Sequence, residues 1–167
     1  MKACKICMVG DFAVGKTSLV ARYVHSRFSE TYLTTVGVKI DTKTISVPSG
    51  EDIKLVLWDI AGKSELAGID TNYLRDASGY LLVADTTRGE TIDSVFSLQQ
   101  QVEQQLGTKP FSLLMNKSDL DDRQAVSQAQ LSRIAGDDWI FSRTSALTGD
   151  GVEAAFAQLG TRLVHRA

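Results

Sequence analysis

A glycine-rich segment near the N-terminus has the residue types and spacing of a phosphate-binding loop. It matches G-x-x-x-x-G-K-[ST] at every fixed position and lies between an apolar run and an amphipathic segment. Its residues are Gly10, Asp11, Phe12, Ala13, Val14, Gly15, Lys16, Thr17 and Ser18. Backbone N–H groups of such a loop point at phosphate oxygens, and the helix N-terminus that follows favours their charge. We therefore expect Lys16 along the β- and γ-phosphates and the Thr17 hydroxyl on Mg²⁺, rather than a glycine turn with a surface lysine.

A carboxylate stands at the end of a second apolar run, where Asp59 follows Trp58. At a strand end one parallel strand away from the phosphate-binding loop, such a group can reach Mg²⁺ through a water molecule, as in a Walker B site. Gly62, three residues later, can offer its backbone N–H to a γ-phosphate. The aspartate alone would be weak evidence, but together with the glycine-rich loop it predicts a nucleotide triphosphate site.

Two later segments indicate which base the nucleotide carries. Residues 116–119 read Asn-Lys-Ser-Asp, and the Asp119 carboxylate can accept hydrogen bonds from both N1–H and N2–H of guanine. Adenine lacks that pair of donors, so the motif argues against an ATP-using P-loop kinase. Ser145 and Ala146, preceded by Thr144, follow another apolar run and can place backbone N–H groups near the guanine O6.

Cys4 and Cys7 form a C-x-x-C, a spacing also found in redox and zinc sites. Both lie in an apolar run that predicts a buried strand, where positions three apart face opposite sides about 10 Å apart. That distance is too long for a disulfide. We expect two free thiols in a reducing compartment.

Apolar runs alternate with amphipathic stretches along the whole chain. Strands are predicted at 3–9, 38–47, 53–58, 80–85, 111–116 and 139–142. In the second of these, Val38, Ile40, Thr42 and Thr44 alternate with polar neighbours, which is typical of a half-exposed edge strand. The turn residues at 48–52 make it antiparallel to the third strand. Helical stripes begin at Leu19, Val95 and Val152.

These elements predict an α/β three-layer P-loop fold: a six-stranded, mostly parallel sheet with one antiparallel edge strand and about five helices. At 167 residues, the chain is expected to form a single domain over 1–167. The net charge of −2 gives no electrostatic case for nucleic acid. No apolar run resembles a signal peptide or a membrane span, so we expect a cytoplasmic protein.

Together these motifs resemble those of a Ras-superfamily small GTPase, in the family's order and spacing, over essentially all of the chain. The Rab branch is the most similar, because residues 32–38 resemble its switch I and residues 57–59 its approach to switch II. A bacterial or archaeal member would fit. The resemblance implies GTP hydrolysis by in-line water attack and Mg²⁺ held by Thr17, Thr35 and Asp59. It assigns the catalytic positions to Lys16, Thr35, Gly62 and an atypical Lys63.

The resemblance also assigns roles in nucleotide binding. Phe28 would pack against the guanine, and Lys117 would lie over the base. The remaining nucleotide-binding positions are 11–18, Thr35, Gly62, Asn116, Asp119, Ser145, Ala146 and Leu147. Two switch loops, at 29–38 and 60–75, would bind effectors and exchange or activating factors.

The chain departs from the family at four places. Lys63 replaces the glutamine that orients the attacking water, and an ammonium cannot accept a hydrogen bond. Phe12 occupies a position that usually has a small residue, close to where a partner's arginine finger would enter. Leu33 stands where heterotrimeric Gα proteins have an arginine.

The fourth departure concerns the aromatic triad through which Rab proteins bind partners. Trp58 and Tyr73 match two of its positions, whereas Ile40 replaces a phenylalanine. Ordinary packing would equally explain both aromatic residues.

These departures lead to two expectations. We expect slow hydrolysis, with a non-hydrolysing pseudo-GTPase as the alternative. Residues 163–167 contain no cysteine, so no prenyl anchor is expected in this chain: either a tail has been removed or the protein is not anchored.

Overall fold

The computed structural model describes residues 1–26, 38–60 and 71–165. These ranges include the glycine-rich loop at 10–18 and the two segments, at 116–119 and 144–147, that are predicted to recognise the base. Five residues that the sequence analysis discussed lie outside these ranges. Four are predicted site residues and one, Leu33, stands where other proteins have an arginine: Phe28, Leu33, Thr35, Gly62 and Lys63.

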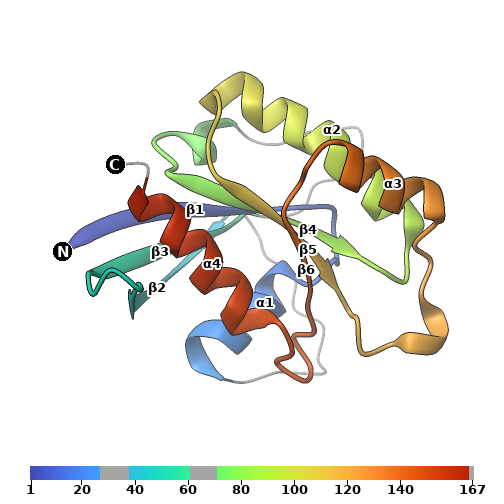
Figure 1. Ribbon diagram of the computed structural model, residues 1–167, viewed down its shortest axis with the longest axis horizontal. Coiled ribbons are helices and arrows are strands. Elements are labelled where there is room, and N and C mark those ends of the chain that lie inside the picture. The colour runs from blue at the N-terminus through green and yellow to red at the C-terminus, as the bar shows by residue number, and fades with distance from the viewer. Residues whose placement is uncertain (27–37, 61–70, 166–167) are drawn as a thin grey trace.

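A six-stranded sheet runs through the middle of the molecule (Figure 1). Its strands are β1 (Lys2–Val9), β2 (Val38–Ser46), β3 (Asp52–Ile60), β4 (Gly79–Asp85), β5 (Phe111–Asn116) and β6 (Phe141–Arg143). Their spatial order is β2-β3-β1-β4-β5-β6. Among the strands that the structure describes, only the β2–β3 pair is antiparallel, so the predicted fold class is confirmed.

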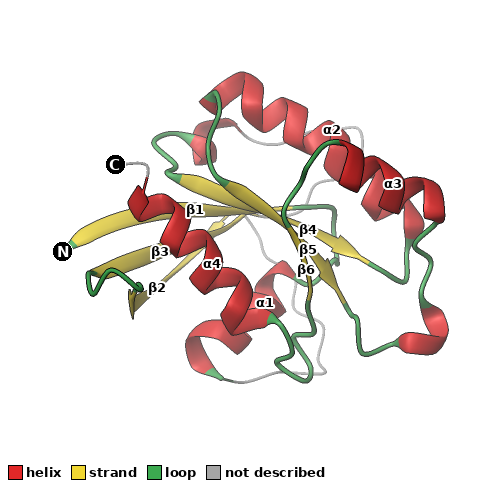
Figure 2. Ribbon diagram, viewed as in Figure 1, coloured by secondary structure: helices red, strands yellow, loops and turns green. Residues whose placement is uncertain are grey.

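The helices divide between the two faces of the sheet (Figure 2). They are α1 (Lys16–His25), α2 (Gly89–Leu106), α3 (Gln128–Gly136) and α4 (Val152–His165), with short 3₁₀ turns η1 (Thr71–Leu74) and η2 (Asp121–Arg123). The described ranges thus contain four α-helices, where the sequence predicted about five. None of these helices is long and apolar enough to cross a membrane.

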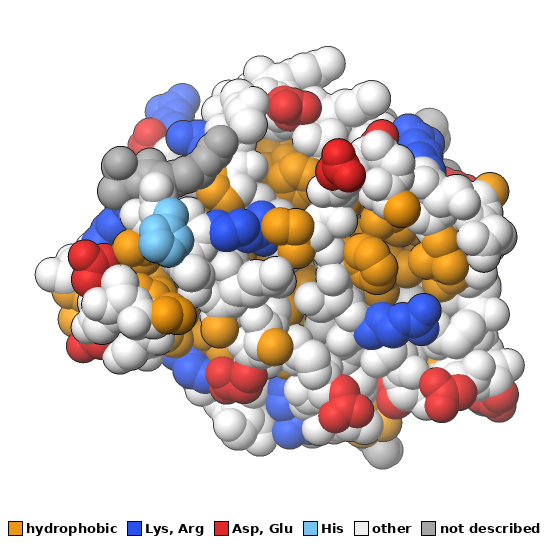
Figure 3. All heavy atoms as spheres, in the orientation of Figure 1, with side chains coloured by type: hydrophobic (Ala, Val, Ile, Leu, Met, Phe, Trp, Pro, Cys, Tyr) orange, Lys and Arg blue, Asp and Glu red, His pale blue; other side chains and the backbone are white. Residues whose placement is uncertain are grey.

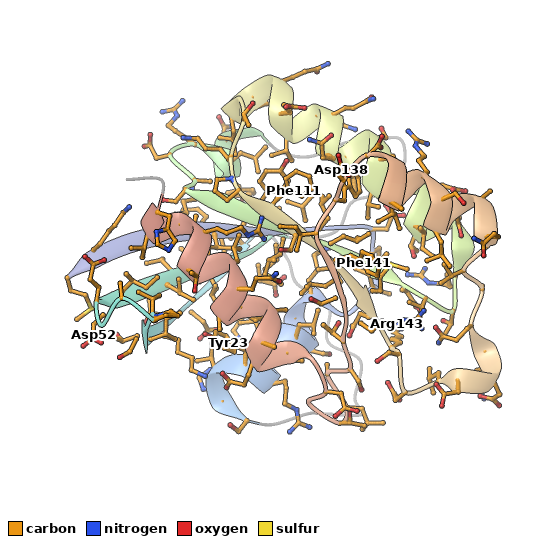
Figure 4. The ribbon with its side chains drawn as sticks, in the orientation of Figure 1. Tyr23, Asp52, Phe111, Asp138, Phe141 and Arg143 are labelled. Carbon is orange, nitrogen blue, oxygen red and sulfur yellow. The ribbon has the colours of Figure 1, made fainter. Side chains whose placement is uncertain are left out.

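Each face of the sheet has its own hydrophobic core. On the face covered by α1 and α4, Tyr23 of α1 stacks on Phe156 of α4 with ring centroids 3.9 Å apart. Figure 4 labels Tyr23 at this interface. Beneath α2 and α3, Phe96 packs against Trp139. The cysteines confirm the strand prediction, because both are free and buried, Cys4 in the first core and Cys7 in the second.

The edge strand β2 is half-exposed as predicted, but the stripe on which that prediction was based is the more exposed one. Ile40, Thr42 and Thr44 are exposed, with Ile40 at 48%. The alternate residues Asp41 and Lys43 are half-buried, because they face α1 and α4: His25 contacts Asp41, and the Lys43 ammonium donates to the Tyr23 carbonyl. The same side of the strand continues into Ile45, which packs against the core, so contacts with the helices and with the core together decide which side of this strand faces inward.

The last strand begins two residues later than the sequence predicted. Trp139 precedes β6, and its ring packs between those of Phe96 and Phe111. The backbone N–H of Trp139 donates to the Ile134 carbonyl near the end of α3. Phe141 and Arg143 on the strand itself are exposed at the sheet edge, where Figure 4 labels both. On the face of the molecule drawn in Figure 3, acidic and basic side chains are interspersed, as the small net charge would suggest.

Candidate functional site

The glycine-rich loop joins the end of β1 to the start of α1, and two of its residues have to be glycine. Gly15 has φ +104°, and a Cβ there would collide with the Asn116 amide. A Cβ on Gly10 would collide with the Val83 carbonyl of β4. The loop is therefore packed against the carboxyl ends of β4 and β5, which brings residues far apart in the sequence to one edge of the sheet.

Lys16 bends back over this loop. It is 6% exposed, and its ammonium donates to the carbonyls of Gly10 at 2.6 Å and Asp11 at 3.2 Å. Burial lowers the pKa of Lys16 to about 8, and the negative charges of Asp59 and Asp11 offset part of that shift. A buried cation of this kind is well placed to receive an anionic ligand.

Thr17 and Asp59, two of the predicted metal ligands, lie in contact. The Thr17 hydroxyl donates to the Asp59 carboxylate at 2.5 Å, and Asp59 is 1% exposed at the end of β3. A hydroxyl and a carboxylate are hard oxygen ligands of the kind that Mg²⁺ prefers, so this pair fits the cation. The described residues contain no group of three or more His, Cys, Asp or Glu that could hold a metal, and the third predicted ligand, Thr35, lies outside them.

The segment predicted to recognise the base is attached to the glycine-rich loop. Asn116, at the end of β5, donates from its amide to the Val14 carbonyl at 2.9 Å and accepts from the Thr144 hydroxyl at 3.2 Å. The Ser145 hydroxyl donates to the Asp119 carboxylate at 2.8 Å. The structure thus holds the two predicted base-binding segments and the glycine-rich loop together through side-chain hydrogen bonds.

Arg22 was not singled out from the sequence, although it contacts the same region. From α1 its guanidinium donates to two consecutive carbonyls, those of Ala146 at 2.7 Å and Leu147 at 2.5 Å. Because a peptide unit is planar, holding the Ala146 carbonyl also orients the N–H of Leu147 toward the opposite side. Arg22 lies more than a hundred residues away in the chain, and no local pattern points to it.

A second group surrounds Asp85, at the end of β4, and the sequence analysis singled out only Lys117 among its members, not Asp85 or Arg88. Lys117 and Arg88 both contact its carboxylate, at 2.9 and 3.1 Å. Arg88 also donates to the Phe12 carbonyl at 2.8 Å, and Lys117 donates to the Ala13 carbonyl at 3.3 Å. A signal was present, because Asp85 follows a buried apolar run just as Asp59 does.

Phe12 and Ala13 form the outer part of the glycine-rich loop. Phe12 is 47% exposed, and Ala13 has φ +66°, a left-handed conformation that few non-glycine residues adopt.

The catalytic positions Thr35, Gly62 and Lys63 lie outside the described residues, so of the predicted catalytic set only Lys16 has a described position.

The two residues at aromatic triad positions lie together beside β2. The rings of Trp58 and Tyr73 are 6.5 Å apart and tilted, and the Lys5 ammonium lies 3.6 Å from the centre of the Trp58 ring. Ile40 is paired with Trp58 across the β2–β3 ladder. Both aromatic side chains are half-buried, whereas Ile40 is exposed.

Comparison with known proteins agrees with this architecture. The sequence pattern described as "Ras family" matches residues 5–165. The Ras-related protein Rab-10 of Caenorhabditis elegans is 33% identical over 162 residues, which cover 96% of this chain and 80% of the relative. The Ras-related protein RABA5b of Arabidopsis thaliana is 35% identical, covering 91% and 70%. The human Ras-related protein Rab-8B is 34% identical, covering 93% and 75%.

Proposed function

The chain belongs to the Ras family of small GTPases and is Rab-like, and from this premise we propose that it is a switch that binds GTP or GDP with Mg²⁺ and hydrolyses GTP slowly. The observation that carries the proposal is the connection between its loops. Asn116 joins the base-recognition segment to the phosphate-binding loop, and Ser145 orients the Asp119 carboxylate. One bound guanine nucleotide would contact all of these segments.

In this proposal the nucleotide lies along the carboxyl edge of the sheet. Asp119 accepts from the guanine N1–H and N2–H, and the N–H groups at 145–147 face O6, with Arg22 holding the carbonyls of that segment. The N–H groups of residues 13–18 and the Lys16 ammonium bind the phosphates. Lys16 would exchange its two loop carbonyls for phosphate oxygens, which also favour its charged form.

Thr17 and Asp59 would hold Mg²⁺, Thr17 directly and Asp59 through water, with Thr35 joining them in the GTP state. When bound, the cation would neutralise phosphate charge. The 2.5 Å contact between the Thr17 hydroxyl and the Asp59 carboxylate supports this assignment, since it already brings both oxygen ligands to one point.

Slow hydrolysis is expected from the side chains near the γ-phosphate. Lys63 has no hydrogen-bond acceptor with which to orient the attacking water, and Phe12 would crowd the space that a partner's arginine needs. Lys16 and the loop amides remain to stabilise the transferred phosphoryl group.

Effectors and regulators would recognise the switch loops at 29–38 and 60–75, whose arrangement the γ-phosphate would set through Thr35 and Gly62. Trp58 precedes the second loop and Tyr73 lies near its end, and the contact between their rings supports a partner surface there.

A pseudo-GTPase that holds one nucleotide without hydrolysing it is the alternative. Lys63 and Phe12 both favour it: Lys63 cannot accept a hydrogen bond from the attacking water, and Phe12, 47% exposed, places a bulky side chain on the loop that would face the γ-phosphate. Both functions require guanine nucleotide, but only the switch requires turnover.

Two measurements test these proposals. Chromatography of the denatured purified protein identifies any nucleotide that it carries, and competition against fluorescent GDP compares GDP with ADP. We expect GDP or GTP in the extract and GDP to compete far better than ADP; equal competition would refute guanine recognition. Single-turnover phosphate release from preloaded GTP then separates the two functions. Slow but complete release supports the switch, and no release supports the pseudo-GTPase.

A further inference from the structure

Asp85 is a buried carboxylate in contact with two cations. Its side chain is 1% exposed, and one carboxylate oxygen contacts both the Arg88 guanidinium at 3.1 Å and the Lys117 ammonium at 2.9 Å. The other oxygen accepts from the Thr87 N–H at 2.9 Å and the Thr87 hydroxyl at 2.6 Å. Both oxygens are therefore held in place from two directions.

The electrostatic balance keeps this carboxylate charged. Burial acts to raise the pKa of Asp85, but hydrogen bonds from Lys117 and Thr87 and the charge of Lys117 outweigh it and lower the pKa below its usual value. An ionised Asp85 with partners on both oxygens in turn restricts where the Lys117 and Arg88 side chains can lie.

Both cations continue from Asp85 to consecutive carbonyls of the phosphate-binding loop. The Arg88 guanidinium donates to the Phe12 carbonyl at 2.8 Å, and the Lys117 ammonium donates to the Ala13 carbonyl at 3.3 Å. In a planar peptide unit the C=O and the following N–H point in opposite directions. Carbonyls drawn toward Asp85 therefore turn the N–H groups of Ala13 and Val14 away from it. The left-handed conformation of Ala13 is part of the same arrangement.

We propose that Asp85 is a positioning residue for phosphate binding: through Arg88 and Lys117 it holds two loop carbonyls so that the next two N–H groups face the β-phosphate. The inference rests on the proposed binding of guanine nucleotide. In this arrangement Arg88 holds the Phe12 carbonyl and Lys117 holds the Ala13 carbonyl. Because Lys117 belongs to the base-recognition segment, the Asp85 carboxylate also connects that segment to the phosphate-binding loop.

The test measures how much of the binding depends on the β-phosphate. Competition against fluorescent GDP gives Kd for GDP and for GMP, which share the base, the ribose and the α-phosphate. The full chain is compared with Arg88→Gln, Asp85→Asn and a control, Arg123→Gln. Arg123 is an exposed arginine of η2 that lies in no ion pair of the described residues, so it provides the same change of charge.

We expect Arg88→Gln to lower the ratio of the GMP Kd to the GDP Kd about tenfold, as loss of a charged hydrogen bond would do. Asp85→Asn should lower it further, because both cations lose their anchor, and Arg123→Gln should leave it unchanged. Thermal unfolding followed by circular dichroism checks that each variant is folded. Should Asp85→Asn not fold, Arg88→Gln decides, since the Arg88 side chain is 37% exposed.

Two results would overturn the inference. The ratio could stay constant in a folded Arg88→Gln variant because neither Kd changes, or it could stay constant because GDP and GMP weaken equally, which would show a general loss of structure rather than of phosphate orientation. A wild type that does not prefer GDP over ADP would instead refute the proposed function, so the two failures are distinguishable.

Discussion

The base-recognition segments and the phosphate-binding loop lie at one edge of the sheet, but their side chains are held in different ways. Asn116 and Asp119 each contact a neighbouring hydroxyl, from Thr144 and Ser145. In the phosphate-binding loop, by contrast, Phe12 is 47% exposed and it is the backbone carbonyls that are held. In the proposed function, specificity for the base thus rests on side chains held by neighbouring hydroxyls, whereas phosphate binding rests on an oriented backbone together with the buried Lys16 ammonium.

This difference explains which part of the site tolerates unusual residues. A backbone N–H is present whichever side chain the residue carries, so Phe12 can replace a small residue without removing a donor to phosphate. A side-chain carboxylate that accepts hydrogen bonds from guanine, as proposed for Asp119, cannot be replaced by a backbone group in this way. The unusual residues therefore should alter the rate of hydrolysis more than the identity of the nucleotide, and four predictions test this comparison.

The largest effect is expected on the base side. Asp119→Asn removes one acceptor and places an amide donor against guanine, so GTP should bind about 100-fold more weakly, because buried polar groups lose their partners. Xanthine nucleotide, which has a carbonyl at that position, should bind relatively better. Competition by GTP and XTP measures this, with Asp122→Asn on exposed η2 as the control. A variant with an unchanged preference for GTP over XTP would refute the assignment of Asp119.

On the phosphate side, the double variant Lys63→Gln, Phe12→Gly should hydrolyse GTP about tenfold faster than the wild type in single turnover without partners. Glutamine restores an acceptor for the attacking water, and glycine clears the space beside the γ-phosphate. A wild type faster than the double variant would mean that Lys63 or Phe12 takes part in another catalytic arrangement. No turnover by either protein would favour the pseudo-GTPase.

Thr17→Asn should separate the two nucleotide states. In the proposed GTP state Thr17 and Thr35 both coordinate Mg²⁺, so losing Thr17 affects a metal site with more protein ligands than in the GDP state. Affinity for GTP with Mg²⁺ should therefore fall about fivefold more than affinity for GDP. Titrations with fluorescent analogues in the presence of Mg²⁺ measure the difference, and EDTA should abolish it. Equal losses for both nucleotides would contradict this metal geometry.

The smallest effect concerns pH. Because the pKa of Lys16 is lowered to about 8, its ammonium loses a proton in the free protein as pH rises through that value. Phosphate binds the protonated form, so the Kd for GDP should increase about fourfold between pH 7 and pH 8.5. GMP lacks the β-phosphate and serves as the control. A profile for GDP that is no steeper than that for GMP would argue against contact between Lys16 and the β-phosphate.

Much of the fold could be predicted because its signals are local. Buried parallel strands appear as continuous apolar runs, and the cysteines follow from alternation within a single strand. The exposed stripe of β2 and the start of β6 could not be predicted in the same way. Contacts of Asp41 and Lys43 with distant helices, and the packing of Trp139 between two aromatic rings, override their local patterns.

By itself the sequence predicted the chemistry that depends on residue types at fixed spacing: the phosphate-binding loop and the motif proposed to recognise guanine. Such motifs can be recognised in a sequence because their function depends on a few neighbouring backbone groups and one or two side chains. Only the tertiary structure decided what holds them in place. Arg88 reaches a carbonyl 76 positions away, and Arg22 reaches carbonyls 124 and 125 positions away. The physical reason is that parallel strands bring their carboxyl ends to one edge, so the loops after those strands meet there however far apart they are in the chain.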